Sequence, residues 1–444
     1  MGVHTYIAGL GSGQGEPGLG RINYLLGYLG NPEKDLRVVH VVGTNGKGST
    51  SNFIASMLQA NDLKVGLYTS PHLVRFNERI QINGMPINDR ALGELLEELQ
   101  PCLEYLAQSE LGRPGMFEVA TAVALAYFAK SKVDYAVLEA GLGGRYDATH
   151  VGRPLITVFT HIDLDHTEVL GNTVELIAAE KADVIPPGGL VVMAPQVEGA
   201  KAVIRDVAQT RGARIVEVDS LYQAEAIEPS LGGTSLNIIY PGGRQAVHIG
   251  MLGSFQITNA LTALAAVHQL VGEGLMIAES GVLQGLANAR WPGRLEVIET
   301  KPVVVLDGAH NLDGFRQLAR NLPIYLSWER LHVIVAITGE KPIESMLEIL
   351  LPLADTAVFT TPKESRTKCV EPSRLLQLAT QRISNTGIAP SFRAAYKRVQ
   401  AEAGPKDVIC VCGSLYLVGE ARELLVDCQD SAGILPVDAE RPKA

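Results

Sequence analysis

The feature that most constrains this chain is an apolar strand that runs directly into a glycine loop, VVHVVGTNGKGST at residues 38–50. The glycines let backbone N–H groups turn toward phosphate oxygens, Lys47 adds a positive charge, and the Ser49 hydroxyl can ligate magnesium. Many glycine loops are only strand-to-helix turns, but the lysine and hydroxyls favour phosphate binding here. The sequence therefore predicts an ATP-binding loop made of Asn45, Gly46, Lys47, Gly48, Ser49 and Thr50.

The spacing within this loop differs from that of an ordinary P-loop. Gly43 stands only three residues before Gly46, and Gly48 separates the lysine from Ser49. We interpret the extra glycine as a feature that distinguishes this loop from a common kinase or GTPase loop.

Composition limits the possible partners and the compartment. The chain of 444 residues has 38 basic and 48 acidic residues and a formal net charge of -10, with no block of like charge, so nucleic acid and membrane surfaces are not expected partners. Five scattered cysteines predict reduced thiols, and Cys410 and Cys412 are expected to be buried apolar residues rather than metal ligands. Without a signal pattern or a long apolar run, we expect a cytoplasmic protein.

The alternation of strands and helices predicts an α/β fold with two domains. The first, residues 1–290, is expected to be a P-loop-type ATPase domain with a mostly parallel sheet, and the second, residues 291–430, a smaller Rossmann-like α/β domain. Strands are expected at 64–69, 135–139, 155–160, 188–194 and 213–218, a hairpin at 235–250, and second-domain strands at 302–306, 331–337, 356–360 and 407–411. Helices are expected from Ser49, at 89–106 and 117–130, from Thr258, and at 312–322, 343–351 and 414–425. Residues 431–444 lack periodicity and are expected to be a disordered tail.

Polar residues at the ends of these strands suggest a metal site. Ser70 follows the second strand, and Glu139 ends a buried strand where a carboxylate requires compensation by a cation. Magnesium held by Ser49, Ser70 and Glu139 fits this pattern. The alternative is a capping carboxylate, or an ion pair between Glu139 and Arg145.

Two further positions are ambiguous. Asp165 and His166 follow another strand, which allows contact with metal or phosphate as readily as an ordinary polar loop. Lys181 lies in a charged helical run of the kind that is usually a solvated face. In the last third, Arg294 and Asp307 fit either turn chemistry or neutralisation of charge on a transferred phosphoryl group.

An ordered set of motifs carries a family resemblance. It comprises GTNGKGS at 43–49, TSPH at 69–72, FE at 117–118, EAGLGGRYDAT at 139–149, DHT at 165–167, EKA at 180–182, PGR at 292–294 and DGAHN at 307–311. Together these motifs, spread over most of the chain, resemble the folylpolyglutamate synthase and bifunctional dihydrofolate synthase family of the Mur ligase superfamily.

The resemblance implies an ATP-dependent ligase that joins L-glutamate to a folate or dihydropteroate carboxylate through an acyl phosphate. It implies two magnesium ions, one held by Ser49, Ser70 and Glu139 and one by His166 with Glu139, and a carbamylated Lys181. The implied catalytic residues are Lys47, Glu139, His166 and Lys181; Asn259, Arg294, Asp307 and His310 are implied to face the nucleotide; and Asp147, Ala148, His310 and Ser414 are grouped as substrate residues.

Several residues depart from the family pattern. Tyr146 stands where leucine is usual, His150 where asparagine is common, and Gly20 where glutamate is usual. The segment 339–342 lacks the usual Asp-Lys-Asp, so no nucleotide role is assigned to it.

Other functions remain open from sequence. A regulatory P-loop ATPase or nucleotide switch would not need the second-domain motifs, and a Mur-type cell-wall amino-acid ligase fits the 117–118 and 139–149 segments less well. The expected partners are small molecules only, and the expected state is a monomer. The sequence leaves open whether the enzyme adds the first glutamate, extends a glutamate chain, or does both.

Overall fold

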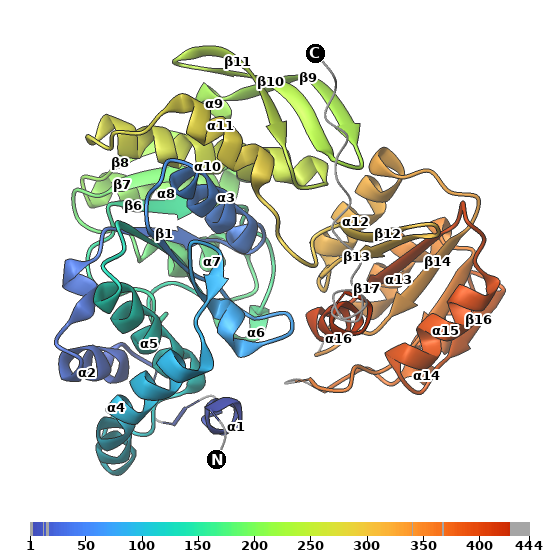
Figure 1. Cartoon of the computed structure of the whole chain (residues 1–444), viewed down its shortest axis with the longest axis horizontal. Coiled ribbons are helices and arrows are strands. Elements are labelled where there is room, and N and C mark those ends of the chain that lie inside the picture. Colours follow the sequence, from blue (N-terminus) through green and yellow to red (C-terminus); the bar gives the residue numbers. More distant parts are fainter. Residues whose placement is uncertain (1–2, 12, 15–16, 340, 366–367, 427–444) are drawn as a thin grey trace. The chain divides into compact units, whose positions relative to one another are not determined.

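The computed structural model describes residues 3–11, 13–14, 17–339, 341–365 and 368–426, so the tail expected at 431–444 lies outside the described residues. The chain divides into two compact units, residues 1–291 and a second unit that begins at Pro292. Each unit has a sheet of its own (Figure 1).

The first unit is built on an eight-stranded sheet in the order β4-β3-β2-β5-β1-β6-β7-β8. Six neighbouring strands are parallel, in the order β2-β5-β1-β6-β7-β8. Strands β3 and β4 add an antiparallel edge beside β2. Their bounds are β1 Val38–Val42, β2 Val65–Tyr68, β3 Ile80–Ile82, β4 Met85–Pro86, β5 Tyr135–Glu139, β6 Ile156–Phe159, β7 Leu190–Met193 and β8 Arg214–Glu217.

Helices cover both faces of this sheet, as its buried apolar strands require. The helices are α2 Gly20–Tyr28, α3 Lys47–Gln59, α4 Asp89–Gln108, α5 Met116–Lys130, α7 Val174–Ala182, α8 Glu198–Thr210, α10 Ser254–Gly272 and α11 Glu279–Asn288, with the short α1 Val3–Ala8, α6 Thr167–Leu170 and α9 Val218–Leu221. In β1, Val39 and Val41 join the apolar cluster of α3 and α10, whereas Val38 joins that of α4 and α5. This alternation is the period of two that a strand imposes.

A separate antiparallel sheet in the first unit has the order β11-β10-β9, with β9 Gln223–Ser230, β10 Gly233–Tyr240 and β11 Gly243–Ile249. The sequence predicts the hairpin of β10 and β11 but not β9. The exposed residues of β9 give little hydrophobic signal, and its position depends on pairing with β10.

The second unit contains a six-stranded sheet in the order β12-β13-β17-β14-β15-β16, parallel except for β12. Its strands are β12 Glu296–Thr300, β13 Val303–Leu306, β14 Leu331–Val335, β15 Thr356–Phe359, β16 Asn385–Ile388 and β17 Val408–Cys412. Its helices are α12 Leu312–Tyr325, α13 Ile343–Leu350, α14 Pro372–Ala379, α15 Phe392–Glu402 and α16 Leu415–Leu425. The predicted fold class, a mostly parallel sheet followed by a second α/β sheet, is confirmed.

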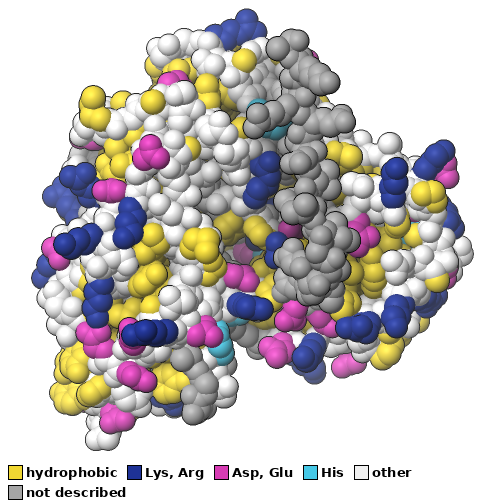
Figure 2. All heavy atoms as spheres, in the orientation of Figure 1, with side chains coloured by type: hydrophobic (Ala, Val, Ile, Leu, Met, Phe, Trp, Pro, Cys, Tyr) yellow, Lys and Arg dark blue, Asp and Glu magenta, His cyan; other side chains and the backbone are white. Residues whose placement is uncertain are grey.

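The surface agrees with the mixed composition. On the face shown in Figure 2, basic and acidic side chains are interspersed. Among the described residues, no helix is both long enough and apolar enough to cross a membrane. The four cysteines in the described residues are free thiols, and Cys410 and Cys412 are buried in β17.

Candidate active site

The phosphate loop lies between β1 and α3, and α3 begins at Lys47, two residues earlier than the sequence suggests. Gly46 precedes the helix with φ of 86°, a left-handed conformation that favours glycine. A Cβ at Gly46 would lie 2.4 Å from Asn259 Oδ1, so α10 closes against the loop at this point. Both conformation and space therefore require the glycine.

The loop is held by the segment that follows β6. The N–H groups of Thr44 and Asn45 donate to the His161 carbonyl at 2.9 and 3.1 Å. The Thr44 hydroxyl donates to the Asp163 carbonyl at 3.1 Å and accepts from the Asp163 N–H at 3.2 Å. His161 and Asp163 are not among the predicted site residues, because these bonds join segments more than a hundred residues apart and leave no local signal.

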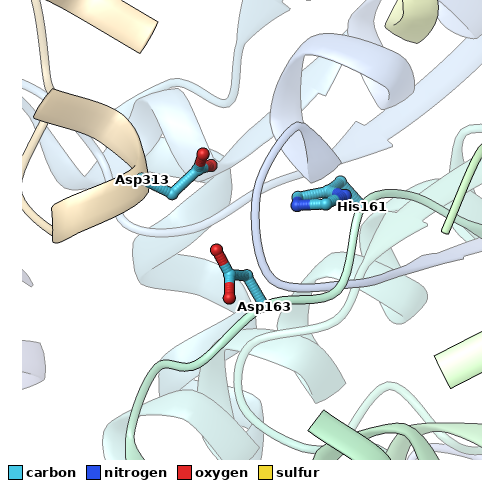
Figure 3. Close-up of side chains that lie close together, drawn as sticks. All are labelled: His161, Asp163 and Asp313. Carbon is cyan, nitrogen blue, oxygen red and sulfur yellow. The ribbon is translucent and has the colours of Figure 1, made fainter. Parts of the chain in front are cut away.

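Figure 3 shows the His161 and Asp163 side chains beside this loop. Their potential ligand atoms lie within 4.8 Å of one another. Asp313, also drawn there, belongs to the first turn of α12 in the second unit.

The first turn of α3 is suited to an anion. Its first helical hydrogen bond runs from the Thr50 N–H to the Gly46 carbonyl, and the N–H groups of Lys47, Gly48 and Ser49 precede it. Such N–H groups have no acceptor within the helix and carry the positive end of its dipole. The Lys47 ammonium donates to the Thr44 carbonyl at 3.0 Å, which folds its charge over the loop.

Ser49 is positioned from α10. Its hydroxyl is buried and accepts a hydrogen bond from Gln256 Nε2 at 3.2 Å, and Asn259 Nδ2 donates to Gln256 Oε1 at 2.9 Å. Asn259 is among the residues predicted to face the nucleotide, whereas Gln256 is not. A polar pair three residues apart on an otherwise apolar helix is the signal that would have found it.

Glu139 lies beside this loop because β5 pairs with β1, which places Glu139 opposite Val41. On the other side of β5 lies β2, which leads to Ser70, and the Ser70 N–H donates to Glu139 Oε2 at 3.0 Å. Parallel strand ends thus bring together the segments of Ser49, Glu139 and Ser70 at one edge of the sheet. Arg145, the ion-pair partner that the sequence also allows for Glu139, pairs with Asp183 at 2.6 Å.

The Asp147 carboxylate is occupied by its own loop. It accepts hydrogen bonds from the N–H groups of Gly141, Leu142 and Thr149 at 2.8–2.9 Å, and from the Thr149 hydroxyl. Burial raises the pKa of the Asp147 carboxyl, and these hydrogen bonds oppose the rise. Ala148 packs into the apolar cluster of α4 and α5. The substrate role that the resemblance implies for both residues stays a prediction.

Lys181 is not on a solvated face. Its side chain in α7 is only 3% exposed, and burial together with the charge of Lys47 lowers the pKa of its amine to about 7. The glycine loop lies directly against it, since a Cβ at Gly144 would be 2.8 Å from Lys181 Cα. His166 precedes the short α6, is exposed, and has a left-handed φ of 49°.

The second unit places its predicted residues at the carboxyl ends of β13 and β17. Asp307 is buried and accepts from the Leu295 and Ala309 N–H groups, both at 2.8 Å. Burial raises the Asp307 pKa, and the positive charge of Arg294 opposes that rise. His310 Nδ1 lies 2.8 Å from the Gly308 carbonyl.

Ser414 begins α16 as its N-cap. Its hydroxyl oxygen accepts from the Tyr416 N–H at 3.2 Å. This bond gives Ser414 a local structural role whether or not it also contacts a substrate.

Three of the residues that depart from the family pattern have clear places. Tyr146 is 53% exposed on the glycine loop, and the Arg145 guanidinium lies over its ring at 5.9 Å. His150 Nδ1 lies 3.0 Å from the Arg145 carbonyl, and Gly20 begins α2, where a Cβ would be 2.9 Å from Leu111 Cδ2.

The comparisons with known proteins cover both units. The Mur ligase middle domain matches residues 41–267, and the Mur ligase glutamate ligase domain matches residues 293–415. The dihydrofolate synthase/folylpolyglutamate synthase of Bacillus subtilis is 37% identical over 428 residues, which cover 92% of this chain and 95% of that protein. The folylpolyglutamate synthase of Lacticaseibacillus casei is 35% identical, with 91% and 94% covered.

Solved structures agree with these relatives. Mycobacterium tuberculosis folylpolyglutamate synthase complexed with ADP and AMPPCP has a TM-score of 0.85 and 31% identity, with 92% of this chain and 96% of that chain covered. A folylpolyglutamate synthase complex with AMPPCP and folate has a TM-score of 0.84 and 33% identity, with 96% and 100% covered. The chain belongs to the dihydrofolate synthase/folylpolyglutamate synthase family of Mur ligases.

Proposed function

We propose that this protein is an ATP-dependent ligase that joins L-glutamate to the carboxylate of a folate or dihydropteroate through an acyl phosphate. The observation that carries this proposal is the meeting of the phosphate loop with the segments of Glu139 and Ser70 at one sheet edge. Relatives that cover nearly the whole chain bear the names of this activity, and a related solved complex holds AMPPCP and folate.

The phosphate loop would bind the β- and γ-phosphates of ATP. The N–H groups at the start of α3 point at the phosphate oxygens, and Lys47 exchanges its Thr44 carbonyl for a phosphate oxygen. These donors then stabilise the charge on the transferred phosphoryl group, while the substrate carboxylate attacks in line. The glutamate amino group afterwards displaces phosphate from the acyl phosphate.

Magnesium fits the oxygen donors present. The Ser49 hydroxyl, the buried Glu139 carboxylate and the Ser70 hydroxyl are the hard ligands that this ion prefers. When bound, magnesium would act as a Lewis acid that neutralises negative charge on the phosphoryl group. Gln256 donates to Ser49 Oγ and so leaves that oxygen with a further lone pair for the ion. A second ion at His166 with Glu139 is part of the proposal.

Lys181 is proposed to carry a carbamate. With a pKa of about 7, its amine is substantially neutral at physiological pH, and the neutral amine is the form that attacks CO2. Formation of the N–C bond with release of one proton from the nitrogen converts the neutral amine into an anionic carbamate. Such an anion beside the glycine loop would compensate the charge of Lys47 and of bound cations.

The second unit is proposed to supply further ligand contacts. Asn259 of the first unit, with Arg294, Asp307 and His310 of the second, would face the nucleotide. Asp147, Ala148, His310 and Ser414 are the proposed substrate residues. Two further expectations belong to the proposal: action as a monomer, which a solution mass measurement tests, and a reducing cytoplasmic compartment, which suits the free thiols.

A product assay tests the function. The protein is incubated with ATP, L-glutamate and either dihydropteroate or tetrahydrofolate, and the masses of the products are measured by mass spectrometry. We expect a glutamate adduct with at least one acceptor, and phosphate release only when acceptor and glutamate are both present. Equal ATP turnover without either co-substrate would instead support a nucleotide switch.

A further inference from the structure

His40 is an unusual residue for its position. It stands in the middle of β1 between pairs of valines, with parallel strands on both sides, and its side chain is 1% exposed. Burial lowers the pKa of its imidazole to about 3, so the ring is neutral at physiological pH. A neutral imidazole has one N–H donor and one acceptor nitrogen, and a buried donor requires a partner.

That partner is Thr149, at the far end of the glycine loop. His40 Nε2 lies 2.8 Å from Thr149 Oγ1, and the Thr149 hydroxyl donates its only hydrogen to Asp147 Oδ1. Because that hydrogen is used, Nε2 must be the donor to the Thr149 oxygen. His40 therefore donates to Thr149, and Thr149 donates to Asp147.

The hydrogen-bond chain connects to both ends of the 139–149 loop through Asp147. Asp147 Oδ1 is held by Thr149, and Asp147 Oδ2 accepts from the N–H groups of Gly141 and Leu142 directly after β5. Between these two anchors, Gly144 lies against the Lys181 backbone, and the Arg145 N–H donates to the Glu180 carbonyl at 3.2 Å. The loop thus connects the end of β5, with Glu139, to the helix of Lys181.

We propose that His40, acting through Thr149 and Asp147, is a positioning residue that holds the 139–149 loop and thereby sets the placement of Glu139 relative to Lys181. This inference rests on the proposed ligase function for its effect on rate, but not for its effect on the loop. The Asp147 carboxylate accepts four hydrogen bonds, which fix its position in the loop. Small misplacements of positioned groups are known to cost large factors in rate.

The experiment uses substitutions that remove the hydrogen bonds of this network at two residues. His40→Leu removes the donor, and Thr149→Val replaces the hydroxyl by a methyl group of similar shape. His40→Gln retains an amide donor, and Thr149→Ser retains the hydroxyl. Val38→Ala is the control. Val38 is buried two residues before His40 on the same side of β1, and its side chain takes no part in the hydrogen-bond network.

Two readouts are measured on each full-length variant: kcat with KM for each substrate, and amide hydrogen exchange at Gly141 and Leu142. We expect His40→Leu and Thr149→Val each to lower kcat about tenfold or more, with smaller changes in KM for ATP, and to speed exchange at both amides. The double variant should lower kcat little further, because both changes break one chain. His40→Gln and Thr149→Ser should restore most of the loss, and Val38→Ala should keep kcat per folded molecule.

The rate and the amide exchange distinguish failure of the ligase proposal from failure of the loop-positioning proposal. Wild-type kcat and slow exchange at Gly141 and Leu142 in Thr149→Val would overturn the inference, and this isosteric variant serves if His40→Leu does not fold. If the wild-type chain makes no glutamate adduct but both amides exchange faster in the variants, the ligase proposal fails while the loop-positioning chain stands.

Discussion

The two units use similar strand ends differently. Each has a buried aspartate in the segment that follows a strand. Asp147 of the first unit accepts backbone N–H groups only from its own loop, whereas Asp307 of the second accepts one from Ala309 in its own loop and one from Leu295, which precedes β12. The first is compensated by a neutral hydroxyl and imidazole, the second by the positive charge of Arg294. A buried carboxylate next to a glycine loop is therefore not by itself a ligand site; what satisfies it decides its role.

The largest expected effect tests whether the chemistry belongs to the first unit. Lys47→Ala and Glu139→Ala should each lower kcat/KM for ligation at least about a hundredfold, since each removes positioned charge. Ser414→Ala should cost about 1 kcal/mol of stability through loss of the α16 N-cap, and its loss of rate, as that of a proposed substrate contact, should be much smaller than that of Lys47→Ala. Steady-state kinetics measure the rates, and urea unfolding measures the stability. A loss of rate in Ser414→Ala as large as in Lys47→Ala would mean that the chemistry depends equally on both units and would break the comparison.

The two aspartates can be compared directly by conversion to asparagine. Asp147→Asn puts an NH2 group against at least two donors, whichever way the amide turns, and should lower the free energy of unfolding by about 2–3 kcal/mol. Asp307→Asn meets one fewer backbone donor and should cost about 1–2 kcal/mol. Urea denaturation measures both values. The reverse order would mean that the Arg294 charge matters more than the number of donors.

Lys181 should give the first unit a distinctive pH dependence. Between about pH 7 and 10, the unfolded amine keeps its proton while the folded amine has lost it. The unfolded state then binds more protons, so this group makes stability rise with pH in that window, by about 1 kcal/mol or more. Urea unfolding at several pH values in CO2-depleted buffer should show this rise in the wild type and not in Lys181→Met.

Lys406 of the second unit is the matched control for that measurement. It is exposed, and its bond to Glu329 raises the pKa of its amine. A group whose pKa is raised on folding makes a constant contribution to the free energy of unfolding at every pH below its unfolded-state pKa. Lys406→Met should therefore leave the rise in stability between about pH 7 and 10 unchanged. A wild-type curve that is flat from pH 7 to 10 would contradict the buried neutral Lys181.

The last prediction concerns the geometry of the phosphate loop. Gly46→Ala forces a side chain into a left-handed conformation against Asn259 and should cost about 1–2 kcal/mol. Gly27→Ala, inside α2 with open space at its Cβ, should instead stabilise by up to about 1 kcal/mol. Thermal unfolding of the two variants compares them. Equal stabilisation by both would show that the phosphate loop is not constrained at Gly46.

Much of the fold could be predicted from local pattern. The strand Tyr135–Glu139 and the start of α4 at Asp89 agree with the sequence-based ranges, and most other boundaries differ by one to four residues. The elements left out include the weakly patterned strands at or next to the sheet edges, β3, β4, β9, β12 and β16, and the helices α1, α2, α6, α8, α9, α11, α14 and α15. Edge strands depend on pairing with a neighbour more than on their own residues.

The sequence by itself determined the strand, loop and helix that form the phosphate site, the order of the motifs and the family. Those signals are local, because glycine conformation, helix start and apolar period depend on neighbouring residues. Only the tertiary structure decided that Lys181 is buried, that Gln256 holds Ser49, that His161 and Asp163 hold Thr44, and that Asp147 is satisfied through Thr149 and His40. Burial and hydrogen bonds between distant segments set these roles, and a pattern read along the chain contains neither.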